Sequence, residues 1–167
     1  MPRPDTSPGY QQLRVGRYSE VGRAYLLTTV THQRARLFGD WPNGSLMSRL
    51  LSNPGTWPGA KVLAWVLMPD HWHGLVVLDE PVPLSKLMKR AKGTTAHAFN
   101  RETGRRGLVW MDGFHDRAVR RDEDLRAVAR YVIANPIRAG LVDSVAEYPF
   151  WDAAWMTPRN PQTWDGL

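Results

Sequence analysis

The sequence contains no cysteine, and this removes a whole class of chemistry. Without thiols there are no disulfide bonds, no thiolate zinc sites and no cysteine nucleophile. Only His, Asp, Glu, Asn and Gln side chains remain as metal ligands, and such nitrogen and oxygen donors suit hard or borderline ions. Any bound metal is therefore as readily Mg²⁺ or Mn²⁺ as zinc.

Long apolar runs are also missing. No stretch approaches the roughly 20 apolar residues that a membrane-spanning helix needs, and the polar start Met1–Asp5 has no apolar signal-peptide region. We expect a cytoplasmic protein with no membrane partner. There is no internal repeat, and 43% hydrophobic residues suffice for one core. The sequence thus predicts a single domain over residues 1–167, with an extended arm at 1–22 and a C-terminal tail at 143–167.

Acidic residues are outnumbered by basic ones, and the imbalance is local. The chain carries 22 Lys and Arg against 16 Asp and Glu, a net charge of +6 with an isoelectric point near 10.1. Between Lys86 and Arg138 there are 13 basic and 6 acidic residues, so this segment alone carries +7. Ordinary solvated helix faces mix both signs, whereas here four basic residues precede the first acid. The pattern predicts binding to a nucleic-acid phosphate backbone.

Apolar periodicity and turn residues outline the secondary structure. In chain order they predict a strand at 24–31, a short helix at 46–51, strands at 61–68 and 71–78, a helix at 83–102, a strand within 108–119 and a helix at 122–135. The strands on either side of Pro69–Asp70 are joined by a tight turn and should pair antiparallel. The order predicts an α+β fold: a ferredoxin-like β-α-β-β-α-β four-stranded antiparallel sheet with helices packed on it, plus a C-terminal catalytic helix.

Two histidines flank one tryptophan where the second strand of that hairpin begins. In a strand, successive side chains point to opposite faces, so His71 and His73 present both imidazoles on one side of the sheet. Two imidazoles on one face can supply two ligands of one divalent metal. The alternative is two unrelated polar residues at the mouth of a turn, because the pattern is only two residues long.

The expected last helix, with Asp122 as its N-cap, carries two further polar residues. Tyr131 lies on the flank of the apolar stripe, and Asn135 follows at i+4, one turn later on the same side. Taken alone, Tyr131 also fits an amphipathic residue with a buried ring and a wet hydroxyl. Asn135 precedes Pro136, so its amide could instead cap a second short helix that ends before Gly140. Capping and metal ligation use the same amide oxygen, and the sequence leaves both open.

Two separate motifs resemble the REP-associated tyrosine transposases, bacterial relatives of the single-tyrosine HUH transposases in the IS200-like family. The motifs are MPDHWHGL at 68–75 and YVIANPIRAGLV at 131–142. Shorter matching stretches are GRY at 16–18, YLLTTVT at 25–31 and GFHDRA at 113–118, so the resemblance spans about residues 14–152. Asp70 departs from the family, which usually has asparagine there, and it places an extra carboxylate beside the expected metal.

The resemblance implies a metal-dependent single-stranded DNA endonuclease and strand transferase. In that family the paired histidines, here His71 and His73, bind a divalent cation, Mg²⁺ or Mn²⁺, with a third ligand four residues after the tyrosine, here Asn135. The metal polarises the scissile phosphate, and the tyrosine, here Tyr131, attacks phosphorus to leave a 5′-phosphotyrosine and a free 3′-hydroxyl. The ester keeps the energy of the broken bond, so the strand can be joined again. A protonated phenol needs help from a base, metal-bound water or a positive charge such as Arg130.

The substrate that the resemblance implies is single-stranded or hairpin DNA formed by repetitive extragenic palindromic sequences, and this favours association with the nucleoid. The basic segment offers these phosphate contacts: Lys86, Lys89, Arg90, Lys92, Arg101, Arg105, Arg106, Arg117 and Arg120. The N-terminal arm is the candidate for reading unpaired bases through Arg14, Arg17 and Tyr18, because arginine bonds base edges bidentately and tyrosine stacks on bases. Monomer and homodimer both remain open.

Two other functions fit parts of the sequence. A domesticated protein could bind repeat hairpins with little or no cleavage, although intact His71, His73 and Tyr131 argue against full loss of chemistry. An RNA-binding ferredoxin-like domain would stack bases on aromatics of its central strands, but the aromatic residues here, Trp65 and Trp72, do not sit in the Gly-Phe-rich motif of such domains. Metal-dependent cleavage separates the first alternative from a transposase. Competition between DNA and RNA of one sequence separates the second.

Overall fold

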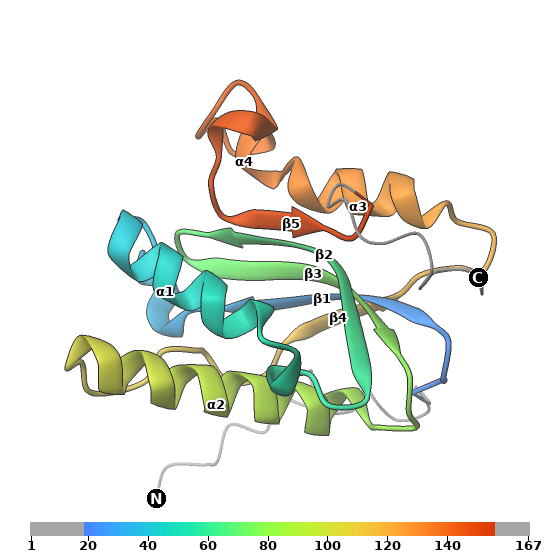
Figure 1. The fold of residues 1–167 in the computed structure, drawn as a ribbon, viewed down its shortest axis with the longest axis horizontal. Helices are drawn as coiled ribbons and strands as arrows, with labels where there is room; N and C mark the ends of the chain where they lie inside the picture. Colours follow the sequence, from blue (N-terminus) through green and yellow to red (C-terminus); the bar gives the residue numbers. More distant parts are fainter. Residues whose placement is uncertain (1–18, 156–167) are drawn as a thin grey trace, which may run out of the picture.

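A five-stranded antiparallel sheet forms the centre of the computed structural model, which describes residues 19–155 (Figure 1). The strands are β1 (Ala24–Val30), β2 (Ala60–Met68), β3 (His71–Leu78), β4 (His115–Ala118) and β5 (Trp151–Ala153). Their spatial order is β4-β1-β3-β2-β5. The α+β class is confirmed, but the expectation of four strands is wrong. The fifth strand has three residues, too few to show an alternating pattern in the sequence.

The hairpin of β2 and β3 has the expected turn at Pro69 and Asp70. Its register pairs Met68 with His71 and Val66 with His73. Most residues of both strands are buried, because helices cover both faces of the sheet. The long apolar runs on either side of the histidine motif are therefore the signature of central strands.

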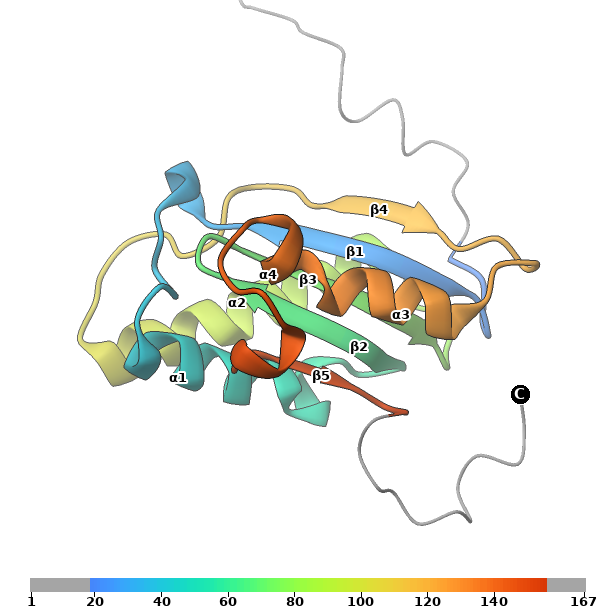
Figure 2. The same ribbon diagram turned by 90° about the horizontal axis from the view of Figure 1, so that it is seen from above.

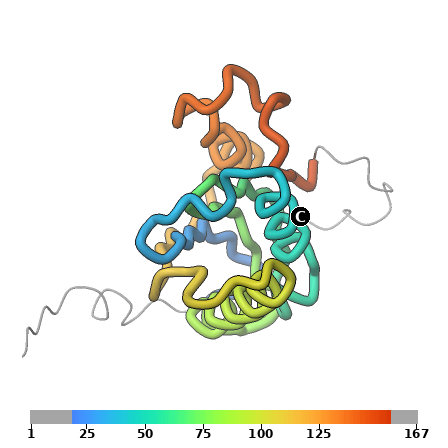
Figure 3. The backbone as a smooth tube through the Cα atoms, turned by 90° about the vertical axis from the view of Figure 1, so that its left-hand side faces the viewer, coloured from blue at the N-terminus to red at the C-terminus, as the bar shows by residue number. Residues whose placement is uncertain are grey.

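Two helices cover one face of the sheet and the third helix covers the other (Figures 1 and 3). The helices α1 (Trp41–Ser52) and α2 (Leu84–Thr103) pack against each other, while α3 (Leu125–Ile133) lies over β2 and β3 (Figure 2). A short helix, α4 (Asn135–Arg138), follows at the end of α3. No helix in the described residues 19–155 is long and apolar enough to cross a membrane.

The starts of α1 and α3 differ from the sequence prediction for local reasons. The helix α1 begins five residues earlier than expected, because the Asp40 side chain accepts a hydrogen bond from Asn43 N and caps it. The helix α3 begins at Leu125 with Asp124 as its cap, so the assignment of Asp122 as the cap is wrong. The side chain of Asp122 pairs with Arg120 instead.

The strand expected within 108–119 is much shorter. Gly113 adopts a left-handed backbone conformation, φ 74°, which interrupts the extended chain, and β4 covers only residues 115–118. Before that turn, Trp110 makes a single bridge to Thr31. In the tail, β5 joins the sheet edge and the half-buried Trp151 donates a hydrogen bond to Val145 O, so this part of the tail packs on the domain.

Candidate active site between the sheet and the third helix

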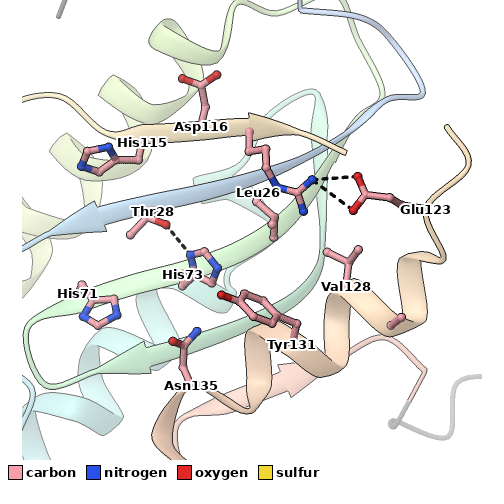
Figure 4. A pocket seen from close by; sticks show the side chains of 12 residues that line it. Leu26, Thr28, His71, His73, His115, Asp116, Glu123, Val128, Tyr131 and Asn135 are labelled. Carbon is pink, nitrogen blue, oxygen red and sulfur yellow. Dashed lines mark hydrogen bonds and ion pairs between the residues drawn. The ribbon is translucent and has the colours of Figure 1, made fainter. Parts of the chain in front are cut away.

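A pocket of about 690 Å³ lies between the sheet and α3 (Figure 4). It is lined by Leu26, Thr28, His71, His73, His115, Asp116, Arg117, Glu123, Ala127, Val128, Tyr131 and Asn135. The two histidines, the tyrosine and the asparagine that the sequence singles out therefore line one cavity. They come from two segments that lie far apart in the chain.

Strand pairing explains why these polar groups share one face of the sheet. His73 pairs with Thr28 on β1, and Thr28 pairs with His115 on β4. Directly paired residues of neighbouring strands point to the same face, so these three side chains form a row across the sheet. His71 lies two residues from His73 and shares that face. The face is the one that α3 covers.

Both imidazoles are held through the same ring nitrogen. His71 Nδ1 lies 2.7 Å from Asp70 Oδ1, and His73 Nδ1 is hydrogen-bonded to Thr28 Oγ1. This leaves Nε2 of each ring as the atom that can bind a ligand in the pocket. Metal-binding histidines commonly use their second ring nitrogen in this way, which orients the ring before the ion binds.

The electrostatics of the site favour a neutral imidazole at His73 and an ionised carboxylate at Asp70. Burial, together with the charges of His71, Arg138 and Arg117, lowers the pKa of His73 to about 4. Burial alone would raise the pKa of Asp70, but the hydrogen bond and charge of His71 and the charge of Arg34 outweigh it and lower this pKa below its ordinary value. A neutral imidazole is the form that ligates metals.

Tyr131 projects from the exposed flank of α3, as the helical periodicity predicts. Its neighbours Val128, Ala129, Val132 and Ile133 are buried against the sheet, whereas Tyr131 is 56% exposed. Figure 4 shows its hydroxyl turned toward His73. The exposure is greater than a residue that mainly packs the core would have.

Asn135 does not cap the helix that follows it. The helix α4 begins at Asn135 itself, and its N-cap residue is Ala134, which makes no side-chain cap bond. The capping alternative for Asn135 is therefore wrong. Its Nδ2 donates to Val132 O at 3.0 Å, which leaves the amide oxygen as the atom able to coordinate a cation.

The donors of the pocket suit a cation that also binds solvent or substrate. Within residues 19–155 no three His, Asp or Glu side chains are grouped so that they could hold a metal. The available donors are the imidazoles of His71 and His73 and the amide oxygen of Asn135. Three ligands leave positions open for water or a phosphate oxygen, as catalytic rather than structural metal sites do.

The expected phosphate contacts divide into two groups. Lys86, Lys89, Arg90, Arg101 and Arg106 are exposed on or just after α2, on the far face of the sheet from the pocket. Four others contact the protein itself. Lys92 donates to Met111 O and Gly113 O, Arg105 donates to Leu108 O, and Arg117 and Arg120 pair with Glu123 and Asp122. The base-reading candidates Arg14, Arg17 and Tyr18 lie outside the described residues.

Sequence reasoning missed Thr28, His115 and Arg138 as parts of the site. Thr28 and His115 join it through strand pairing, which the sequence does not reveal position by position. Arg138 stacks on the Tyr131 ring, with its Cζ 3.9 Å from the ring centroid. The sequence signal for Arg138 was its place in the second motif, three residues after Asn135.

The aromatics that an RNA-binding domain would need are not accessible. Trp65 is 8% exposed, and Trp72 is fully buried and stacked on Trp57, with ring centroids 5.0 Å apart. Bases cannot stack on rings that the core encloses. The RNA-binding alternative therefore loses the feature on which it depended.

Comparisons with known proteins give a consistent result. The family model described as "Transposase IS200 like" matches residues 22–135. The REP-associated tyrosine transposase of Escherichia coli K12 is 29% identical over 91 residues, which are 54% of this chain and 52% of that protein, so the chain matches about half the length of this curated relative. A solved structure of a REP-associated tyrosine transposase bound to a REP hairpin covers 81% of this chain and 79% of its own, with a TM-score of 0.65 and 23% identity. At this level of sequence identity, the likeness shows that the two proteins share a fold.

Proposed function

The chain belongs to the IS200-like transposase family, and we propose that it is a REP-associated transposase that cuts single-stranded DNA and joins it again through Tyr131. The observation that carries the proposal is the Tyr131 hydroxyl, which faces His73 in a pocket that His71 and Asn135 also line (Figure 4). A nucleophile opposite two imidazoles that can hold a divalent cation is the arrangement that metal-assisted phosphoryl transfer needs.

The reaction exchanges one phosphodiester bond for another. The Tyr131 oxygen forms a bond to phosphorus and the bond from phosphorus to the 3′ oxygen breaks, so the electron pair stays on the 3′ oxygen. The phenol proton passes to water, and the 3′ oxygen takes up a proton to become a hydroxyl. The 5′-phosphotyrosine keeps the bond energy, and attack by another 3′-hydroxyl reverses the steps and releases Tyr131.

A divalent cation, Mg²⁺ or Mn²⁺, fits the donor set of this pocket. His71, His73 and Asn135 would hold it, and once bound it would withdraw charge from the phosphate oxygens. The protein supplies the rest: Asp70 and Thr28 orient the two imidazoles, and α3 presents the phenol from the opposite side. The absence of thiols in the chain agrees with an ion that prefers oxygen and nitrogen donors.

Hairpin DNA formed by palindromic repeats is the substrate we propose. The similar structure is of a protein bound to a REP hairpin, and the basic segment of this chain offers exposed cations on α2 that suit phosphate binding. A hairpin-binding protein without cleavage is the remaining alternative, and the same experiment decides between them.

The test is covalent adduct formation with a hairpin oligonucleotide copied from the palindromic repeats that flank the gene, including their single-stranded ends. With Mn²⁺, the wild-type protein should form a denaturant-resistant protein–DNA adduct, and chelation of the metal should abolish it. His71→Ala and His73→Ala should lose the adduct and bind the hairpin within a few fold of the wild type. His97→Ala, a histidine on α2 away from the pocket, is the control. Full activity of the double mutant His71→Ala/His73→Ala in chelator would refute the metal site, and binding without an adduct would favour the hairpin-binding alternative.

A further inference from the structure

The second motif brings an arginine onto the face of the proposed nucleophile. The Arg138 guanidinium lies over the Tyr131 ring, with Cζ 3.9 Å from the centroid. Arg130, the nearest basic residue in the chain, is exposed on α3 and has no ring contact among the described residues. The positive charge beside the phenol therefore comes from the next helix and not from the preceding residue.

The break between α3 and α4 makes this contact possible. Seven residues of straight helix would separate Tyr131 and Arg138 by about 10.5 Å along the axis. The chain turns at Ala134 (φ −81°, ψ 2°), two residues before the buried Pro136. At this turn Asn135 Nδ2 donates a hydrogen bond to Val132 O. Proline has no N–H to continue the helical ladder, so the helix ends and restarts. The restart places Arg138 back over the ring.

Arg138 differs in its electrostatic partners from the three arginines of the segment 117–121. Arg117 is paired with Glu123, Arg120 with Asp122 and Arg121 with Glu20. Arg138 makes no ion pair with an acid within residues 19–155. This positive charge therefore has no acidic partner among the described residues and lies directly beside the Tyr131 phenol.

We propose that Arg138 is a further catalytic residue, which holds the Tyr131 ring through its face and binds the scissile phosphate through its N–H edge. This inference rests on the proposed function. A guanidinium is planar and has five N–H donors, so it can stack on a ring and bond an oxyanion at the same time. A lysine ammonium carries the charge but has no plane to stack. The negative charge that develops on the phosphate oxygens during attack is stabilised by donors already in place.

Single-turnover rates of adduct formation test the proposal with Arg138→Gln, Arg138→Lys and the matched control Arg130→Gln. Arg138→Gln should slow the reaction about 100-fold, the effect of removing one donor to a developing oxyanion. Hairpin affinity and the thermal unfolding midpoint should stay close to wild type. Arg138→Lys should react less than about tenfold faster than Arg138→Gln, because lysine restores the charge but not the planar fork. Arg130→Gln should react at the wild-type rate. An Arg138→Gln rate within about threefold of the wild type would overturn the proposal.

A second measurement separates this proposal from the proposed function. In the wild-type protein without metal, the NMR resonance of Arg138 Nε–H should lie upfield because of the Tyr131 ring, and a single-stranded hexathymidylate should shift it. If the wild type makes no adduct but this resonance responds, the function is wrong and the phosphate contact stands. If the resonance does not respond, Arg138 does not bind phosphate, whatever the adduct assay gives.

Discussion

Asp70 and Thr28 each hold one of the two histidines, but they constrain its ring differently. Asp70 is ionised and can only accept, so its partner Nδ1 of His71 must carry a proton, and Nε2 is the ring nitrogen left to bind a ligand. Thr28 can donate or accept, and its hydroxyl allows either tautomer of His73. The carboxylate at position 70, where the resembling family usually has asparagine, therefore selects one tautomer. The side chain of Arg34 supports it with an ion pair at 3.4 Å.

Replacement of Tyr131 by phenylalanine distinguishes chemistry from packing. Phenylalanine keeps the ring and its contact with Arg138 but has no oxygen to attack phosphorus. We expect Tyr131→Phe to fold normally, bind the hairpin about as well as the wild type and form no denaturant-resistant adduct on a gel. An adduct with Tyr131→Phe would mean that another residue attacks. Tyr25→Phe is the matched control, because Tyr25 is buried and bonds to Glu20 N.

The lowered pKa of His73 makes the stability of the metal-free protein depend on pH. In the unfolded chain this imidazole binds a proton near pH 6.5, whereas in the folded chain it does so only near pH 4. Between these values the unfolded state binds more protons, so stability falls as the pH falls from 6.5 to 4. The loss at pH 4 should be roughly 3 kcal/mol. Urea unfolding in chelator should show it.

The control for this pH dependence is the corresponding glutamine variant. His73→Gln cannot titrate in either state and should flatten the fall in the free energy of unfolding between pH 6.5 and pH 4. His97→Gln, on α2 and away from the pocket, should keep the wild-type slope. An equal slope in wild type and His73→Gln would show that other groups cause the fall.

At the scale of elements, Trp72 and Gly74 fix the position of β3. Trp72 lies between the two histidines, and Gly74 follows the second. Trp72 points to the face opposite the histidines, is fully buried and stacks on Trp57. Its ring lies across Gly74, where an added Cβ would come within 2.3 Å of the ring. Gly74 therefore gives the space that the indole occupies, and the indole fixes the strand from which both imidazoles project.

Filling that space should destabilise the protein. Gly74→Ala forces the buried indole to shift and should cost about 2 kcal/mol of unfolding free energy, within the range for overpacked cores. Gly93→Ala is the control, because no atom lies within 4 Å of its added Cβ and it sits inside α2. That change should stabilise the protein by roughly 0.5–1 kcal/mol. Urea unfolding of both variants checks this, and a Gly74→Ala variant as stable as the wild type would contradict it.

At the scale of the whole molecule, the sheet separates a basic face from the pocket. Exposed lysines and arginines lie on α2, and residues of α3 line the pocket. These two helices lie on opposite faces of the sheet (Figure 1). Side chains on α2 thus lie away from the groups that we assign to the chemistry. Binding and cleavage should therefore respond to different substitutions.

A triple substitution on α2 tests this separation. Lys86, Lys89 and Arg90 carry the charges to be removed, and their change to alanine should weaken binding to hairpins of every sequence. The slope of log affinity against log salt should flatten by about one for each DNA phosphate that is no longer neutralised. At saturating DNA the rate of adduct formation should match the wild type. Lys92 is left intact because it anchors the loop at Met111 and Gly113.

The matched control for the triple variant is Arg49→Ala, an exposed arginine on α1 that pairs with Glu102. This change removes a positive charge from the same side of the sheet without touching the basic residues of α2. It should leave the salt slope as in the wild type. A triple variant with that same unchanged slope would place the DNA on another surface.

The sequence alone determined the parts of this protein that depend on local order. Alternation along 71–78 predicted that His71 and His73 share a face, and helical periodicity predicted that Tyr131 lies outside the buried stripe. Both follow from the geometry of one element, and both hold. The two motifs also predicted the family, because residue types at set spacings can be recognised without knowledge of the tertiary structure.

Only the tertiary structure decided which residues meet across elements. Strand pairing gave His73 its Thr28 partner, and a helix break at Ala134 brought Arg138, rather than Arg130, onto Tyr131. The tertiary structure also decided which residue caps the helix α3 and which strand forms the edge of the sheet. Asp124 rather than Asp122 caps α3, and three residues of the tail add a strand to the sheet edge. These features depend on hydrogen-bond partners far away or on angles at one residue, and neither leaves a periodic signal in the chain.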